Sequence, residues 1–183
     1  MRVVTGKARG RKLSVPAGRD VRPTSDRVRE AVFSSLGELV PGARVLDLFA
    51  GSGALGIEAL SRGATRAVFV EKAGAALSVV RSNLEVTGLG DRATVLSRDA
   101  FAAIRGLRRA NERFDLVFLD PPYDAGLLER ALDSIASGGL LAEGGAIVAE
   151  HRTSLKMDVP RGLRTRTRKS YGGTAVTTFE RDG

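Results

Sequence analysis

The stretch RVLDLFAGSGALGIEAL, residues 44 to 60, determines the fold class and raises the first question about function. An apolar run leads into Gly51, Gly53 and Gly56, which spell G-x-G-x-x-G. A second apolar run, AVFVE, ends at Glu71, 20 positions after Gly51. A glycine turn between two strands, with an acid ending the second, is typical of an adenosine-cofactor site in a parallel sheet. The glycines alone leave open whether that cofactor contains a pyrophosphate.

Apolar runs and helical patterns alternate from residue 44 onward. The patterns predict strands at 44–48, 66–71, 93–97, 114–119 and 145–150, and helices at 54–62, 73–87, 100–110 and 126–136. Continuous apolar runs such as LVFL (116–119) suit strands that are covered on both faces. Near the end, LRTRTRKSY and TAVTTFE flank Gly172 and Gly173, which predicts an antiparallel hairpin. We therefore predict an α/β, Rossmann-like sheet that is mostly parallel with an antiparallel last strand.

The first 43 residues follow a different pattern. Residues 2–5 and 11–15, separated by GKARG, predict a short basic β-hairpin. RPTSDRVREAVFSSLG (22–37) predicts a helix that opens at Pro23, is capped by Thr24 or Ser25 and ends at Gly37. Its expected apolar stripe leaves Arg27 and Arg29 outside and consists of Val28, Ala31, Val32, Ser35 and Leu36. We predict an extension over 1–22 and one domain over 23–183.

Composition excludes several classes of protein. A chain of 183 residues is long enough for one domain with a well-filled core. The absence of cysteine excludes disulfides and thiolate metal sites, and the lone His151 cannot form a metal site with its neighbours. We expect His151 to be a surface or hydrogen-bonded residue. No apolar stretch approaches the ~20 residues that span a bilayer, so we expect a cytoplasmic protein without membrane contact.

Charge is distributed unevenly along the chain. Residues 1–30 hold nine Lys/Arg against three Asp/Glu, and 151–171 hold seven against one, whereas 31–150 hold twelve against fifteen. This distribution favours a catalytic body flanked by contacts to nucleic acid, although basic ends could also serve solubility alone. The candidate nucleic-acid contacts at the two ends are Arg9, Arg11, Lys12, Arg166, Arg168 and Lys169.

Asp47 distinguishes two classes of cofactor. A pyrophosphate at a helix N-terminus is anionic, so a carboxylate beside it opposes binding. S-adenosylmethionine carries a sulfonium and an ammonium instead, which a carboxylate attracts. Glu71 could accept from ribose hydroxyls in either case, and Asp99 could accept from the adenine amine, although a helix N-cap is its simpler explanation. The expected cofactor-binding residues are Asp47, Phe49, Gly51, Gly53, Glu71, Lys72, Asp99, Ala100 and Asp120, with no metal.

The sequence LDPPY places Asp120, Pro121, Pro122 and Tyr123 after the fourth predicted strand. The two prolines restrict the backbone, so the Pro121 carbonyl can point outward beside the Asp120 carboxylate. Two acceptors that accept hydrogen bonds from both N–H groups of an exocyclic amine favour a pyramidal nitrogen. The lone pair of such a nitrogen can attack a methyl group. Tyr123 would stack on the base, which is worth roughly 1–3 kcal/mol. An ordinary turn explains each residue alone but not the combination.

Two motifs resemble those of Rossmann-like S-adenosylmethionine methyltransferases that act on exocyclic amines: DLFAGSGALG (47–56) and DPPY (120–123). ARGRKLSVP (8–16) and RPTSDRVREAVFSSL (22–36) resemble the RsmD-type family, bacterial enzymes that methylate guanine N2 in 16S ribosomal RNA. The resemblance covers nearly the whole chain. It implies a seven-stranded sheet with a reversed last strand, and a partly or fully assembled small ribosomal subunit as substrate.

The resemblance also implies roles for individual residues. Asp120, Pro121 and Tyr123 would hold the guanine, while the acids and glycines named above would contact the cofactor. The residues implied near the cofactor mouth and the RNA are Arg22, Thr24, Arg27 and Arg29, for which pairing with Asp26 and Glu30 is an equal explanation.

Three other functions stay open at this point. A DNA adenine-amino methyltransferase shares DPPY, but this chain has no room for a separate target-recognition region. An NAD-dependent oxidoreductase would use the glycines and Glu71 but explains neither Asp47 nor DPPY. A non-catalytic ribosome-binding module would not need Asp120. We expect a monomeric RNA methyltransferase, and the sequence leaves open which guanine it modifies and whether naked RNA suffices.

Overall fold

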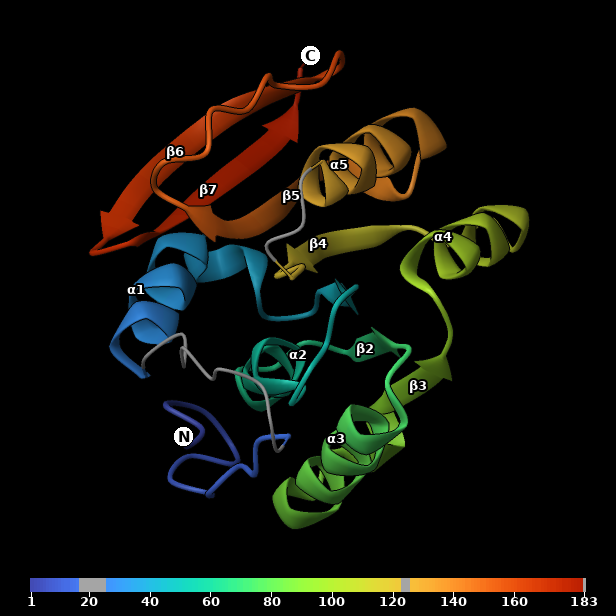
Figure 1. Cartoon of the computed structure of the whole chain (residues 1–183). Coiled ribbons are helices and arrows are strands. Elements are labelled where there is room, and N and C mark those ends of the chain that lie inside the picture. Colours follow the sequence, from blue (N-terminus) through green and yellow to red (C-terminus); the bar gives the residue numbers. More distant parts are fainter. Residues whose placement is uncertain (17–25, 123–125, 183) are drawn as a thin grey trace.

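A seven-stranded sheet forms the centre of the protein, with the strand order β3-β2-β1-β4-β5-β7-β6 (Figure 1). This computed structural model describes residues 1–16, 26–122 and 126–182. The strands are β1 (Arg44–Asp47), β2 (Arg66–Glu71), β3 (Ala93–Ser97), β4 (Phe114–Leu119), β5 (Leu141–Arg152), β6 (Leu163–Tyr171) and β7 (Thr174–Arg181). β1 to β5 pair in parallel, and β7 is antiparallel to both of its neighbours. The predicted mostly parallel sheet with a reversed last strand is confirmed.

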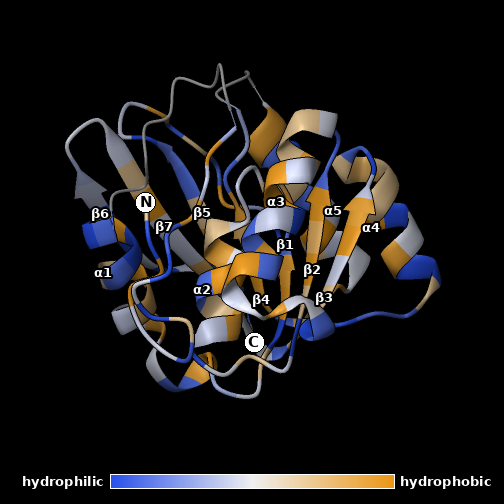
Figure 2. Ribbon diagram, turned by 90° about the horizontal axis from the view of Figure 1, so that it is seen from below, coloured by the Kyte–Doolittle hydropathy of each residue, from blue (hydrophilic) through white to orange (hydrophobic). Residues whose placement is uncertain are grey.

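Helices cover both faces of the sheet (Figure 1). One face packs against α1 (Asp26–Leu36), α2 (Ala54–Ser61) and α3 (Gly74–Thr87), and the other against α4 (Ala100–Arg109) and α5 (Leu127–Gly138). Short 3₁₀ turns at Gly37–Leu39 and Gly90–Arg92 complete the described helices. The inner strands β1, β2 and β4 are hydrophobic along most of their length in Figure 2, because both of their faces are buried in a core.

The β5 strand is longer than the sequence predicts. It begins at Leu141 rather than 145 and ends at Arg152 rather than 150. Leu141 pairs with Phe114 ahead of a register shift in the β4–β5 ladder, and Arg152 pairs with Thr174 of β7. The prediction stopped at the apolar run, whereas the strand continues as far as backbone pairing does.

The predicted N-terminal hairpin has antiparallel backbone contacts but no regular strands. Residues 1–16 form an antiparallel loop with a single bridge between Arg2 and Lys12, and they contain no regular strand. Val3 exchanges backbone hydrogen bonds with Arg11 and Gly10. The N–H groups of Val4 and Thr5 donate to Glu58 of α2. Val3 lies in the same core cluster as α1 and α2, so this segment packs as part of the domain. The predicted boundary at residue 22 falls outside the described residues.

The expected orientation of α1 is also wrong. Its buried residues are Arg29, Val32, Phe33 and Leu36, whereas Ser35 is exposed. The buried residues still have helical spacing, but their side of the helix is rotated relative to the prediction. The rotated side includes Arg29, whose buried charge is compensated by ion pairs with Asp26 and Glu58. The expected start of this helix at residues 23–25 lies outside the described residues.

Two further features concern the part of the chain that the structure describes. No helix there is long and apolar enough to cross a membrane. Among the same residues, no three His, Asp or Glu side chains are grouped in a way that could hold a metal ion.

We expect Gly56→Ala to destabilise the protein. A Cβ at this position would lie 2.3 Å from Cε1 of Phe69, because α2 packs closely on β2 here. Such overpacking typically costs about 1–3 kcal/mol of the free energy of unfolding, measurable by denaturant titration. Gly74→Ala is the matched control, since Gly74 is helical and has no atom within 4 Å of an added Cβ. Equal unfolding midpoints for the two variants would contradict the close packing.

Candidate active site

Four acids predicted from the sequence lie at the carboxyl edge of the parallel strands. Asp47 ends β1, Glu71 ends β2, and Asp99 and Asp120 follow β3 and β4. Asp47 is paired between Phe69 of β2 and Phe118 of β4. The sheet reverses its order between β1 and β4, and ligands of open α/β sheets bind beside such a switch point.

The glycine turn crosses this edge between β1 and α2. Gly51 and Gly53 have φ of +57° and +78°, a left-handed conformation that favours glycine, and Gly53 caps α2. The Gly51 N–H donates to Glu71 Oε2 at 3.0 Å, and the Ala50 N–H donates to the Val70 carbonyl at 3.0 Å. The turn is therefore attached to the end of β2 by two hydrogen bonds.

Asp47 is buried in this turn with 2% of its surface exposed. Its Oδ2 accepts from the Gly56 N–H at 3.1 Å, which attaches the first turn of α2 to the end of β1. Burial raises the pKa of Asp47 to about 7; the Gly56 hydrogen bond partly opposes the rise and the nearby Glu71 adds to it. A site in which two acids are close together and one is hard to ionise favours a cationic ligand over an anionic one.

Glu71 is occupied mainly by backbone donors. Oε1 accepts from the N–H groups of Lys72 and Ala73, each at 2.9 Å, in addition to the Gly51 contact of Oε2. The side chain of Lys72 is exposed, and Phe49 is half-buried against the core on the α4 side of the sheet. Glu71 therefore orders the turn whatever ligand binds.

Asp99 caps α4. Its Oδ1 accepts from the N–H groups of Phe101 at 2.9 Å and Ala102 at 3.2 Å, which is the N-cap explanation weighed from the sequence. The side chain is exposed, and the adjacent Ala100 is buried in the first turn of the helix. Contact between Asp99 and an adenine amine stays a prediction.

The predicted catalytic residues follow β4 directly. Asp120 is half-buried, Pro121 is buried and Pro122 is exposed. Leu119 pairs with Ala149 of β5, so Asp120 leaves the sheet at the same edge as Asp47. Tyr123 lies outside the described residues.

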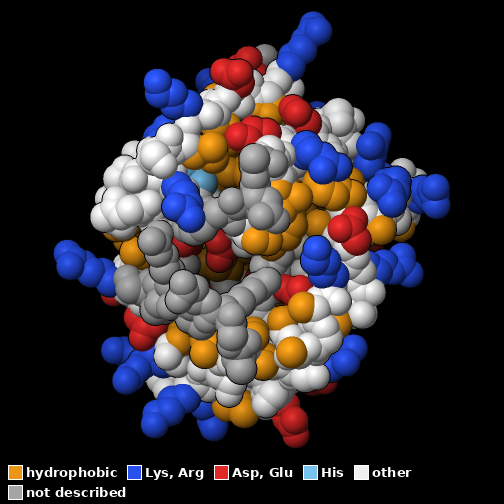
Figure 3. Space-filling model, in the orientation of Figure 1, with side chains coloured by type: hydrophobic (Ala, Val, Ile, Leu, Met, Phe, Trp, Pro, Cys, Tyr) orange, Lys and Arg blue, Asp and Glu red, His pale blue; other side chains and the backbone are white. Residues whose placement is uncertain are grey.

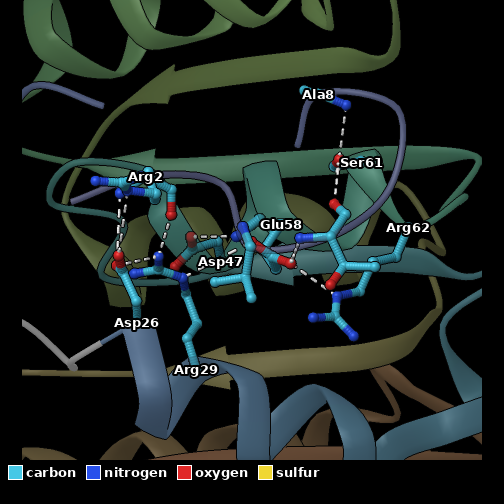
Figure 4. A network of polar contacts seen from close by, with 11 residues as sticks. Arg2, Ala8, Asp26, Arg29, Asp47, Glu58, Ser61 and Arg62 are labelled. Atoms are coloured by element: carbon cyan, nitrogen blue, oxygen red, sulfur yellow. Dashed lines mark hydrogen bonds and ion pairs between the residues drawn. The ribbon is translucent and has the colours of Figure 1, made fainter. Parts of the chain in front are cut away.

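The sequence did not single out Glu58, a buried acid in the middle of α2 (Figure 4). Its carboxylate accepts from the Val4 N–H at 2.8 Å and from the Thr5 N–H at 3.0 Å. Arg62 Nε donates to it at 2.8 Å, and Arg29 Nε lies 3.8 Å away. An acid in the otherwise apolar helix ALGIEALS was the available signal, because such an acid must find partners when the helix is buried.

This network corrects the expected role of Arg29. Its side chain is completely buried, and its Nη2 donates to Asp26 at 2.8 Å and to the Arg2 carbonyl. A buried guanidinium held by Asp26 and Glu58 is a structural residue, not an RNA contact. Glu30, the other partner considered, is exposed.

The other candidate RNA residues differ in their positions. Arg9, Arg11, Lys12 and Arg27 are exposed, whereas Arg22 and Thr24 lie outside the described residues. The basic residues of the edge strand β6 point to both sides, because paired neighbours share a face. Arg168 is opposite Thr177 on the α5 side and Lys169 is opposite Val176 on the α1 side.

Arg166 is exposed at a register shift in β6, and Arg168 also donates to the carbonyls of Thr153 and Leu155. The C-terminal basic residues are therefore an exposed edge rather than one flat patch.

His151 is buried and hydrogen-bonded at both ring nitrogens. Nδ1 is 2.8 Å from the Arg152 carbonyl, which can only accept, so Nδ1 carries the proton and Nε2 accepts from the Thr177 hydroxyl at 2.8 Å. Burial is the main cause that lowers its pKa below the usual value. The expectation of a hydrogen-bonded rather than catalytic histidine agrees with this geometry.

We predict that Asp47→Asn changes stability in a pH-dependent way. The folded state raises the pKa of Asp47, so the wild type loses stability as pH rises from about 4 to 7, while the amide of the variant stays neutral throughout. The variant should therefore match the wild type near pH 4 and exceed it at pH 8 by up to about 4 kcal/mol. Chemical unfolding at pH 4.5, 6 and 8 measures this difference. A difference that is constant with pH would contradict the perturbed carboxyl.

Comparison with known proteins assigns the family. The family model described as "Conserved hypothetical protein 95" matches residues 1–180. The chain is 41% identical to "Putative rRNA methyltransferase YlbH" of Bacillus subtilis (strain 168), covering 100% of both. It is 36% identical to "Ribosomal RNA small subunit methyltransferase D" of Escherichia coli (strain K12), covering 100% of this chain and 90% of that protein.

A solved structure, "Putative methyltransferase yhhF from Escherichia coli", superposes with a TM-score of 0.87 at 35% identity and covers 100% of this chain and 98% of that one. Sequence and structure therefore agree over the full length. The chain belongs to the conserved hypothetical protein 95 family, which includes the ribosomal RNA small subunit methyltransferase D proteins, as the resemblance in its sequence predicted.

Proposed function

We propose that this protein transfers a methyl group from S-adenosylmethionine to the exocyclic N2 amine of a guanine in small-subunit ribosomal RNA. The observation that carries the proposal is the position of Asp120-Pro121-Pro122. These residues follow β4 beside Asp47, at the switch point of the sheet. Relatives of the chain are named as ribosomal RNA methyltransferases. We expect the protein to act as a monomer in the cytoplasm.

The residues of the glycine turn fit S-adenosylmethionine better than a dinucleotide. Asp47 is buried near Glu71 and has a raised pKa, so a nearby sulfonium or ammonium would stabilise its ionised form. A pyrophosphate would add negative charge beside two acids instead. When bound, the cofactor supplies an electrophilic methyl group. Asp47, the backbone of Gly51 and Gly53, and Glu71 would hold it, with Asp99 and Ala100 beside the adenine.

Asp120 and the Pro121 carbonyl would orient the guanine amine. A base in an RNA helix must first leave its stack. The two acceptors would then accept hydrogen bonds from the two N–H groups of the amine. This arrangement favours a pyramidal nitrogen with an available lone pair. Asp120 and Pro121 would thereby hold the nitrogen toward the methyl group that the bound cofactor would supply, and the alkylated nitrogen would then lose a proton. Positioning can supply about 7–11 kcal/mol of such a reaction, so no strong base is required.

Exposed basic residues near the two chain ends would contact the RNA backbone. Arg9, Arg11 and Lys12 belong to the segment that packs on α2, and Arg166, Arg168 and Lys169 lie on β6. In the view of Figure 3, Lys and Arg side chains lie around the rim of the molecule, and acidic side chains lie in the central hollow. This distribution suits a polyanionic substrate that surrounds a site for a cationic cofactor.

The test is transfer of a radiolabelled methyl group from S-adenosylmethionine. The acceptors are unmodified small ribosomal subunits, naked small-subunit RNA and duplex DNA, each followed by digestion to nucleosides. We expect label in N2-methylguanosine from the RNA, and the ratio of subunit to naked RNA reports whether assembly presents the target. Label in DNA adenine would instead support a DNA methyltransferase.

Asp120→Ala should abolish methyl transfer while cofactor affinity stays within a few-fold of wild type. The reason is that Asp120 would hold the amine at the methyl end of the cofactor, while Asp47, the glycine turn and Glu71 would hold the rest of the cofactor. Turnover assays and calorimetric titration with S-adenosylhomocysteine separate the two properties. Asp133→Ala, which removes an exposed acid of α5, is the matched control. Loss of cofactor binding together with turnover would mean that Asp120 has a different role.

Replacing Arg9, Arg11 and Lys12 by alanine should weaken RNA binding. All three side chains are exposed. Each lost phosphate contact makes the fall of log K with log salt less steep by roughly 0.7–0.9. Affinity for small-subunit RNA measured between 50 and 300 mM salt gives this slope. Unchanged affinity at low salt would show that the N-terminal segment does not contact the RNA.

A further inference from the structure

A cluster of arginines lies outside the two basic chain ends. Residues 98–113 hold five arginines and two acids, although the surrounding region 31–150 is slightly acidic. The two acids are occupied, because Asp99 caps α4 and Glu112 pairs with Arg44. The arginines therefore determine the charge of this part of the surface.

Two of the five arginines have a structural explanation. A Cβ on Gly138 would lie 2.9 Å from Cδ of Arg108, and a Cβ on Gly139 would lie 3.6 Å from Nη1 of Arg113. Both side chains therefore lie against the C-terminal end of α5, where the helix dipole favours a cation.

The other three, Arg98, Arg105 and Arg109, form what we call the α4 arginine surface. All three are exposed. Within residues 1–16, 26–122 and 126–182, no carboxylate lies within 4.0 Å of their guanidinium groups. Arg105 and Arg109 are four positions apart on α4 and so share a side. Nη1 of Arg98 lies 3.5 Å from a Cβ on Gly106, which extends the surface along the same helix.

Helix stability does not explain this arrangement. Like charges at i and i+4 repel, and Arg98 precedes the N-terminus of α4, where the dipole disfavours a cation. Only Arg109, in the last turn, gains from the dipole. A group of cations without local counter-charges is instead typical of a surface that binds a polyanion.

The surface begins beside the candidate active site. The Arg98 N–H donates to the carbonyl of Glu71, so the first arginine leaves the sheet at the cofactor edge, and α4 extends away from it. Figure 1 shows α4 and the β6–β7 hairpin on opposite sides of the molecule, and Figure 3 shows Lys and Arg side chains gathered over α4. An RNA whose target base enters at the carboxyl edge could contact both.

We propose that Arg98, Arg105 and Arg109 bind backbone phosphates of the ribosomal RNA substrate, as a third contact in addition to the basic chain ends. The inference rests on the proposed function. Arg105 and Arg109 are about 6 Å apart along the helix axis, which lets both contact one strand of the RNA backbone. The phosphates carry no sequence information, so the surface adds affinity and orientation rather than choice of guanine.

The test compares Arg105→Ala/Arg109→Ala with the control Arg66→Ala/Arg81→Ala, which removes two exposed arginines from β2 and α3, outside both basic chain ends. Arg98 is left intact because it lies beside Glu71. For each protein we would measure affinity for naked small-subunit RNA across salt, the KM for unmodified small subunits, and affinity for S-adenosylhomocysteine. The last measurement verifies that the fold and cofactor site are intact.

We expect the α4 variant to bind RNA roughly tenfold more weakly near 100 mM salt, with a salt slope smaller by about 1.4–1.8, while the control matches the wild type. Its KM should rise with unchanged kcat and cofactor affinity. RNA binding equal to the control would overturn the proposal. A higher KM for subunits with unchanged RNA binding would also overturn it, because the surface would then contact a ribosomal protein. The RNA-binding measurement needs no turnover, so it stays informative if the wild type methylates nothing.

Discussion

The short helix α2 is attached at both of its sides by buried carboxylates, and the candidate site depends on these attachments. Asp47 at the end of β1 accepts from the Gly56 N–H, and Glu58 within the helix accepts from the N–H groups of Val4 and Thr5. The first contact positions the glycine turn, and the second positions the basic N-terminal segment. Because one eight-residue helix carries both, the cofactor turn and a candidate RNA surface share one rigid element.

Burying these acids has an electrostatic consequence that connects fold and function. Glu58 is compensated by Arg62 and Arg29, so its charge has partners in the absence of any ligand. Burial raises the pKa of Asp47 to about 7, its backbone donor opposes the rise, and the nearby Glu71 adds to it. The protein therefore holds an under-compensated carboxyl where the cofactor should bind. A cationic ligand would stabilise the ionised form of Asp47, and strongly perturbed pKa values of this kind are common at functional sites.

Much of the fold was predictable from the sequence, because apolar strand patterns alternate with helical patterns along the chain. The bounds of β2, β3 and β4 agree with the prediction, and the reversed last strand followed from Gly172-Gly173. The N-terminal segment and α1 were not predictable in detail. Their geometry depends on Glu58 and Arg29, two charged residues about 30 positions apart that pattern analysis assigns to the surface. Long-range pairing of charges leaves no periodic signal in a single sequence.

The candidate site was predictable to a similar degree. The acids Asp47, Glu71, Asp99 and Asp120 were expected at strand ends, and the parallel sheet brings those ends to one edge. The sequence could not indicate that Asp47 and Glu71 also accept from the backbone, because such contacts depend on the folded geometry. The five arginines of residues 98–113 are visible in the sequence, but a charge total over 31–150 averages them with distant acids.

A calorimetric titration of the wild type and Asp47→Asn with S-adenosylmethionine and with NAD would show most directly whether the buried acid selects the cofactor. We expect the wild type to bind S-adenosylmethionine and not NAD, and Asp47→Asn to bind the sulfonium cofactor more weakly. We also expect binding to release a proton near pH 7, because a cation beside Asp47 lowers its raised pKa. Binding of NAD, or S-adenosylmethionine affinity that does not depend on Asp47, would contradict this role of the carboxyl.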